Sequence, residues 1–207
     1  MREITVSKLS KILEEHKRWC DTGKKEGKKA DLSRANLWNA NLSYANLSRA
    51  NLCGANLSDT NLYCANLSDA NLCGADLYEA VLSNADLSEA DLSRANLWNA
   101  KLFYADMKGA DLQDANLRGA NLYSANLRDA NLSGADLYEA VLSNAVLSYA
   151  NLEGANLSCA NLSEVLGLNI EQLSEVRTLY KAKLDPKLMK QVKKKYPHLL
   201  EEPEYEE

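Results

Sequence analysis

Phenylalanine, histidine and long apolar runs are scarce in this 207-residue sequence. It contains one Phe, and its two His residues, His16 and His198, lie far apart in different segments. No run approaches the roughly 18 uninterrupted apolar residues of a membrane-spanning helix, which argues against that class of protein. The first residues also lack the apolar core of a signal peptide, so we expect a protein that is not secreted.

The cysteines do not form the pattern of a disulfide framework. They number five, an odd count without paired spacing, which favours a reducing compartment, so we predict a cytoplasmic protein with free thiols. The sequence also shows no zinc-type spacing, no Gly-rich phosphate loop and no triad containing His. It therefore predicts neither a metal site nor a cofactor site, and it argues against an enzyme.

Three residue types dominate what is present, with 36 Leu, 27 Ala and 21 Asn. From residue 30 to residue 164 they follow one rule over 27 consecutive units: Ala, then Asn or Asp, then Leu, then two variable residues. The exceptions are Thr60 at the Ala position, Met107 at the Leu position, and Val81, Lys101, Val141 and Val146 at the Asn/Asp position. A period held without a break over this length indicates a repeat architecture.

A five-residue period fits neither one helix nor one straight strand. On an α-helix successive Leu side chains would scatter around the axis, and on a straight strand they would alternate between its two sides. So many Leu at a fixed phase are also unlike a disordered chain. The remaining solution is a chain that turns a corner after every unit, with Ala and Leu facing inward and Asn or Asp facing outward.

Longer internal repeats indicate how many units make one coil. Residues 50–55 recur at 70–75, an offset of 20, whereas 31–40 recur at 91–100 and 74–85 recur at 134–145, both offsets of 60. An offset of 60 fits coils of three or four units. The offset of 20 favours four.

The tandem Ala-(Asn/Asp)-Leu-X-X array resembles the pentapeptide-repeat family over 135 of the 207 residues. The resemblance implies an all-β solenoid, a right-handed quadrilateral parallel β-helix of about seven coils with Leu and the preceding Ala inward. We therefore expect three parts: an N-terminal helical cap and basic linker (1–29), the repeat β-helix (30–164), and a C-terminal helical cap with an acidic tail (165–207).

The flanking segments have the spacing of short amphipathic helices. Apolar residues predict a helix over 5–20 that covers the first coil, with His16 packed in the cap rather than binding a ligand. A second helix is predicted over 170–180, and Asp185-Pro186 begins a third. The tail over 201–207 is expected to fray. In some family members the C-terminal helices make a two-fold dimer, so a homodimer and a plain cap both remain open.

The variable residues are the candidates for function. In a four-sided coil, residues 20 apart share a face, and we name faces one to four by Leu32, Leu37, Leu42 and Leu47. Face three carries almost no charge and forms the candidate interaction surface: Tyr44, Tyr63, Val81, Phe103, Tyr104, Tyr123 and Val141. Face two has a net charge of −4 and an aromatic column, and its candidate acidic surface consists of Asp76, Glu79, Asp136 and Glu139.

Two functions are weighed from these surfaces. The first is a non-catalytic scaffold that binds a protein partner of unknown identity, or a second copy, through an outer face, with no membrane and no direct nucleic acid. The second follows from the resemblance, because some family members bind DNA gyrase or topoisomerase as DNA mimics. The alternative without a binding function is that the aromatic rings only stiffen the rod and the acids only keep it soluble. Cys53 and Cys73 on face one would lie one coil apart, near enough for pairing under oxidation.

Overall fold

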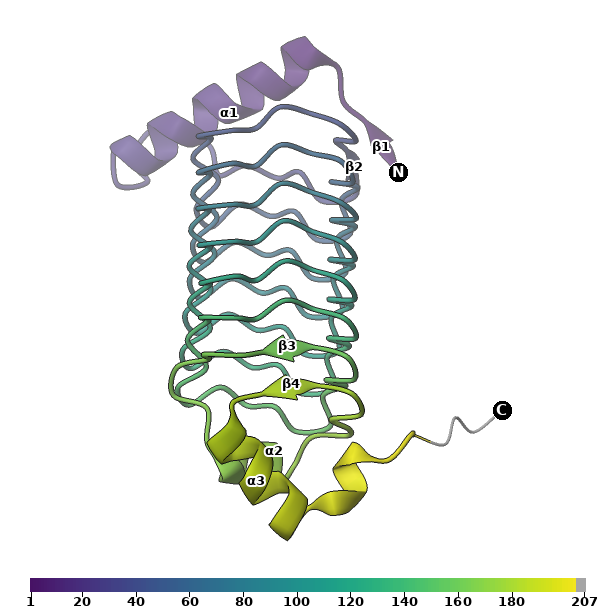
Figure 1. Ribbon diagram of the computed structural model, residues 1–207. Helices are drawn as coiled ribbons and strands as arrows, with labels where there is room; N and C mark the ends of the chain where they lie inside the picture. The colour runs from purple at the N-terminus through teal and green to yellow at the C-terminus, as the bar shows by residue number, and fades with distance from the viewer. Residues whose placement is uncertain (204–207) are drawn as a thin grey trace.

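The repeats form a stack of flat coils that is closed by helices at both ends. The computed structural model describes residues 1–203 (Figure 1). In chain order its elements are β1 (Arg2–Glu3), α1 (Val6–Asp21), β2 (Ala35–Asn36), β3 (Asn161–Leu162), α2 (Ile170–Leu173), β4 (Lys183–Leu184), α3 (Pro186–Lys195) and the 3-10 helix η1 (Pro197–Leu200). Within residues 1–203, no helix has the length and apolar composition needed to cross a membrane.

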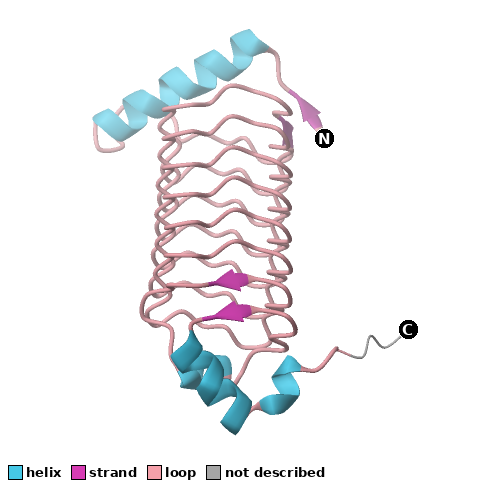
Figure 2. Ribbon diagram, viewed as in Figure 1, coloured by secondary structure: helices cyan, strands magenta, loops and turns pink. Residues whose placement is uncertain are grey.

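Successive coils pair in parallel at an offset of 20 residues, as four repeats per coil require. Asp31 bridges to Asn51, Asn51 to Asn71, and the same offset continues along the array. The backbone N–H of Asn51 donates to Ala30 at 3.0 Å, and the N–H of Leu32 donates to Asn51 at 2.7 Å. Each repeat contributes a single bridging residue, because a turn follows it at once. Figure 2 therefore shows the array mostly as loops, and among the described residues only β1–β2 and β3–β4 are paired strands.

The interior of the stack consists of Leu and Ala side chains. The Leu positions of the array are at most 3 % exposed, and most are fully buried. Ala must alternate with Leu, because a larger residue at the Ala position would overpack so narrow a core. The one substitution there, Thr60, is buried and donates its hydroxyl to the Leu37 carbonyl at 2.9 Å.

The Asn or Asp of each repeat shapes the turn that follows it. Its side-chain oxygen accepts the backbone N–H two residues later, as Asn56 does from Ser58 at 3.0 Å. The second variable residue then has a positive φ, between 53° and 67° in all 27 repeats. Glycine occupies only some of these corners, so residues such as Tyr44 and Glu79 adopt a left-handed backbone there. Each corner that is not glycine therefore carries one side chain on the outside of the coil.

Asn side chains also connect one coil to the next. The Nδ2 of Asn96 donates to Asp76 at 2.9 Å, and the Nδ2 of Asn116 donates to Asn96 at 3.0 Å. Because a carboxylate can only accept, an Asp can stand only at the accepting end of such a chain of hydrogen bonds, as Asp76 does.

At the N-terminus, α1 lies across the open end of the first coil (Figure 1). Thr5 caps it by accepting the Lys8 N–H at 3.3 Å, and the helix occupies nearly the predicted range. The short strand β1 pairs in parallel with β2, which the sequence did not predict. It covers part of the backbone edge that the first coil would otherwise expose.

At the C-terminus, the predicted helix over 170–180 was wrong in length. Only Ile170–Leu173 is helical, and the chain then resumes the coil, with Thr178 bridging Asn156 and Lys183 bridging Asn161. The offset here is 22 residues because α2 is inserted at the corner. The array therefore gains a partial eighth coil, on which α3 and η1 pack. Helix α3 begins at the predicted Pro186. The expected fraying of the acidic tail lies partly outside the described residues.

Candidate functional site

Face three carries two pairs of tyrosines, each formed between neighbouring coils. The rings of Tyr44 and Tyr63 meet edge to face, with centroids 5.6 Å apart. Tyr104 and Tyr123 repeat this arrangement at 5.7 Å, three coils further on. In each pair the first tyrosine stands at a left-handed corner and the second follows the Leu of the next coil. The structure therefore brings four of the seven candidate residues together as two equivalent pairs.

The other three candidates on face three are half-buried. Phe103 packs edge to face against Tyr104 at 6.2 Å, which extends the second pair. Val81 and Val141 occupy bridging positions, and Lys101 bridges to Val81 in the same column. A valine there loses the side-chain oxygen that normally shapes the turn. Val81 lies between the two tyrosine pairs and Val141 lies one coil beyond the second pair, and the pairs provide the most exposed apolar area of the face.

The tyrosine rings remain exposed to solvent although they contact each other. Tyr44 remains 71 % exposed and Tyr104 remains 55 % exposed, although each contacts its partner ring. An edge-to-face contact between exposed rings adds roughly 0.5–1.5 kcal/mol, so stiffening of the rod is compatible with the geometry. The exposed ring faces are nonetheless available to a further molecule, so both interpretations of face three stand.

The candidate acidic surface divides into two chemically different parts. Asp76 and Asp136 are tied into the stack, since each accepts the N–H of the following tyrosine and an Asn side chain of the next coil. Glu79 and Glu139 are exposed corner residues. Hydrogen bonding to Glu79 raises the pKa of Tyr78, and Glu139 does the same to Tyr138.

Several acids of the rod are also neutralised by arginines. Arg49 pairs with Asp69 at 3.2 Å, Arg118 with Asp136 at 3.1 Å, and Arg128 with its neighbour Asp129 at 3.3 Å. Three carboxylates of the array are therefore already engaged by arginines of the chain itself.

Beside the acids of face two runs a column of rings and one cation. The indole N–H of Trp38 donates to Asp59 at 3.0 Å, and Tyr78 meets Trp98 edge to face at 5.7 Å. Further along, the guanidinium of Arg118 lies 4.4 Å from the centroid of the Tyr138 ring. The sequence shows the aromatic column through its spacing of 20, but the pairing of Arg118 with this column was missed.

Cys53 and Cys73 on face one lie one coil apart. Burial raises the pKa of the Cys53 thiol, and neighbouring Cys73 raises it further. All five cysteines are free thiols. Among the described residues, no three His, Cys, Asp or Glu side chains gather in a way that fits a metal ion.

Comparison with known families gives the same repeat pattern. A model described as pentapeptide repeats matches in eight copies over residues 30–63, 60–99, 100–137 and 135–165. The chain belongs to the pentapeptide-repeat family. No curated protein sequence matches it.

Solved structures of other pentapeptide-repeat proteins resemble the chain. HetL of the cyanobacterium Nostoc sp. strain PCC 7120, described as involved in regulating heterocyst differentiation, is 30 % identical, with 87 % of this chain and 91 % of HetL covered and a TM-score of 0.30. Full-length QnrB1, a plasmid-mediated fluoroquinolone resistance protein, is 20 % identical, with 79 % and 89 % covered and a TM-score of 0.41. A protein of the Arabidopsis thaliana thylakoid lumen is 29 % identical, with 53 % and 66 % covered and a TM-score of 0.26. At these TM-scores the superpositions assign no function to the chain.

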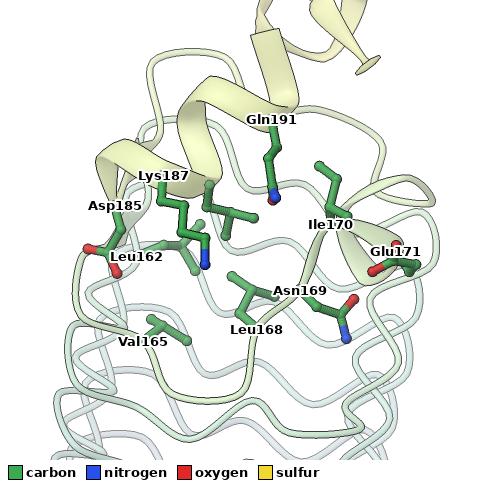
Figure 3. Close-up of a pocket in the computed structure, with 10 residues that line it drawn as sticks. Leu162, Val165, Leu168, Asn169, Ile170, Glu171, Asp185, Lys187 and Gln191 are labelled. Atoms are coloured by element: carbon green, nitrogen blue, oxygen red, sulfur yellow. The ribbon is translucent and has the colours of Figure 1, made fainter. Parts of the chain in front are cut away.

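The C-terminal end of this pentapeptide-repeat protein holds a cavity that the sequence did not predict. It has a volume of about 460 Å³ and lies between the last coil and α3. Figure 3 shows Leu162, Val165 and Leu168 within it, with Lys187 and Gln191 reaching in from α3. The cap thus leaves part of the final core layer uncovered.

Proposed function

We propose that this pentapeptide-repeat protein is a non-catalytic scaffold that binds a protein partner through the tyrosine pairs of face three. The observation that carries the proposal is the exposure of Tyr44 and Tyr104 on a face with almost no charge. Tyrosine is enriched in the cores of protein interfaces, where charged residues are depleted. Two equivalent pairs three coils apart offer a partner two anchor points along one line.

We infer that the rod is a right-handed parallel β-helix, as the family implies, and that it works in the cytoplasm. The parallel pairing at a constant offset supports the first statement. The five free thiols support the second. A rigid rod with a filled core presents fixed surfaces, which suits a scaffold better than chemistry that needs a water-excluding cleft.

The test compares affinity purifications with two tyrosine variants. The double substitution Tyr44→Ser and Tyr104→Ser removes the exposed rings of face three. Tyr149→Ser is the matched control, because Tyr149 is a 77 % exposed corner residue with the same left-handed backbone. We expect a partner that is retained by the wild type and by the control and is lost with the double variant. Equal recovery by all three proteins would refute the proposal.

Two further measurements separate the alternatives. Light scattering of the wild type and the double variant shows whether the bound partner is a second copy of the chain. A gyrase supercoiling assay tests the DNA-mimic function. Inhibition that survives the loss of the face-three tyrosines and disappears with Glu79→Gln and Glu139→Gln would favour the DNA mimic over the scaffold proposed here.

A further inference from the structure

Face two contains the same short sequence twice, at an interval of three coils. Residues 74–85 and 134–145 are identical, so Asp76-Leu77-Tyr78-Glu79 recurs as Asp136-Leu137-Tyr138-Glu139. The backbone environments match as well. In both copies the Asp Oδ1 accepts the tyrosine N–H, at 3.2 and 3.1 Å, and an Asn Nδ2 from the next coil, at 2.9 Å.

The second copy binds an arginine of its own chain. Arg118, one coil before Tyr138, places its guanidinium 4.4 Å from the ring centroid and donates from Nη1 to Asp136 Oδ2 at 3.1 Å. The carboxylate thus uses one oxygen for the stack and the other for the cation. This arrangement joins a cation–π contact to a charge-assisted hydrogen bond on one guanidinium.

The first copy has a serine where the second has the arginine. Ser58 precedes Tyr78 by 20 residues, just as Arg118 precedes Tyr138. Among the described residues, Asp76 Oδ2 receives no side-chain hydrogen bond or ion pair, whereas the equivalent oxygen of Asp136 binds Arg118. The two copies therefore differ in their cation and not in the groups that bind it.

The surroundings of Ser58 have the same rings as those of Arg118, which has Trp98 one coil before it and Tyr138 one coil after it, but they carry one more acid. Trp38 stands one coil before Ser58 and Tyr78 one coil after it, so the two rings lie two coils, or roughly 10 Å, apart. Asp59, the corner residue beside Ser58, is held by the indole N–H of Trp38 at 3.0 Å, and its own N–H donates to Tyr78 at 2.9 Å. The corresponding corner beside Arg118 is Gly119. A cation at Ser58 would lie beside the Tyr78 ring, as Arg118 lies beside Tyr138, and near the carboxylates of Asp59 and Asp76.

We propose that the site around Ser58, formed by Trp38, Asp59, Asp76 and Tyr78, binds an arginine side chain of a protein partner. A flat guanidinium can stack on the Tyr78 ring and donate to the carboxylates of Asp76 and Asp59, which the compact ammonium of lysine does less well. The internal Arg118 shows the binding mode. Face two also has the most negative net charge of the four faces, which attracts a basic segment. This site is independent of the tyrosine pairs of face three and does not rest on the function proposed above.

The direct test is an NMR titration of the full chain with the acetylated and amidated peptide Gly-Arg-Gly. The chain has three tryptophans, so the indole N–H signals report separately on Trp38, Trp98 and Trp19. We expect saturable shifts at Trp38 and none at Trp19, which lies on α1. The same peptide with lysine should shift the Trp38 signal less, and the peptide with citrulline, which is flat but uncharged, should not shift it.

Three variants complete the test. Ser58→Arg supplies the missing guanidinium from the chain itself. It should weaken peptide binding about tenfold or more, because the peptide then loses one cation–π contact and one ion pair. Ser93→Arg is the matched control, because it adds the same charge after the Leu of a repeat on face one, without the aromatic column. Arg118→Ser should create a second binding site, seen as new shifts of the Tyr138 amide.

An unmoved Trp38 signal would overturn the proposal. Equal binding of the arginine and lysine peptides would overturn the assignment to arginine. Unchanged peptide binding by Ser58→Arg would also overturn the proposal. So would an equal loss of binding in Ser58→Arg and Ser93→Arg, because the peptide would then respond only to the overall charge of the rod. If Arg118→Ser gains no second site, the analogy between the two copies fails.

Discussion

His16 on α1 accepts the backbone N–H of Ala30 at its Nδ1 atom, at a distance of 3.0 Å, and thereby ties the N-terminal cap to the first residue of the array. The imidazole is fully buried, and its Nε2 lies 3.8 Å from the Sγ of Cys20. A nitrogen that accepts a hydrogen bond carries no proton, so the ring is neutral here. Burial is the main cause that lowers the pKa of His16; the backbone of Ser48 opposes it, and Lys29 adds to it.

Acidification should therefore loosen the N-terminal cap. The pKa of His16 is lower in the folded protein than its ordinary value of about 6.5, so the unfolded chain binds more protons as the pH falls. The stabilising contribution is complete above that value and is lost as the pH falls through the lower, folded-state pKa. We expect the urea midpoint to drop from pH 7.5 towards pH 5 more steeply in the wild type than in His16→Gln, whose amide oxygen accepts from Ala30 at every pH. Identical slopes would show that His16 does not govern the cap.

Two substitutions at repeat positions of the core should differ strongly in their effect on the free energy of unfolding. Leu97 is fully buried in the middle of the stack, so Leu97→Ala should lower the free energy of unfolding by about 2–5 kcal/mol. Thr60→Ala restores the residue that every other repeat has. It removes a hydrogen bond to the Leu37 carbonyl, but that carbonyl keeps the Ala40 N–H at 3.0 Å, so we expect a change within about 1 kcal/mol. Urea denaturation followed by circular dichroism measures both, and a large loss with Thr60→Ala would contradict the packing argument.

Because of the hydrogen bonds between coils, the stability of the protein should depend on whether a repeat has Asn or Asp at its outward position. Asn96 donates to Asp76 and accepts from Asn116, so Asn96→Asp removes a donor and places a second carboxylate beside the first. We expect a loss of about 1–2 kcal/mol at pH 7. The loss should shrink as the pH falls towards 4, because a protonated carboxyl regains a donor.

Asp76→Asn is the control for this effect. It adds a donor that can reach Asn56 in the preceding coil, so stability should stay level or rise. Equal losses in the two variants, measured by urea denaturation at both pH values, would count against this role of the side-chain hydrogen bonds.

The sequence predicts the array well because its rule is local and is repeated without interruption. The inward Leu and Ala and the outward Asn or Asp follow from spacing alone, and the internal repeats favour the offset of 20. The contacts of Tyr44 with Tyr63 and of Arg118 with Tyr138 do not follow, because they depend on which rotamer each exposed side chain adopts between coils. The strand β1 has too few residues to show a periodic pattern, so its pairing with β2 could not be foreseen.

The helix predicted over 170–180 was too long because the spacing of the apolar residues in this segment fits both a helix and a coil of the array. Leu173, Val176 and Leu179 fit the period of a helix, but Leu179, Ala182 and Leu184 have the spacing of Leu, Ala and Leu in the array. The second reading is the one the structure adopts, with Thr178 in the Asn position and its hydroxyl accepting the Tyr180 N–H at 3.1 Å. Lys181 has the positive φ of a corner, at 56°. A search that allows Thr or Lys at the outward position would have found this coil.

The eighth coil should therefore behave as part of the core. Leu179 is fully buried, and its N–H donates to the Leu199 carbonyl at 2.7 Å, which joins the coil to η1. We expect Leu179→Ala to cost about 2–5 kcal/mol locally and to speed hydrogen exchange over 174–200, while the central coils keep their protection, because solenoid units interact mainly with their neighbours. Leu166→Ala is the control, since Leu166 is 59 % exposed and its truncation should change stability by less than about 0.5 kcal/mol. If both variants exchange like the wild type, residues 174–184 contribute little to the fold, and the stack ends at Glu164 in energetic terms.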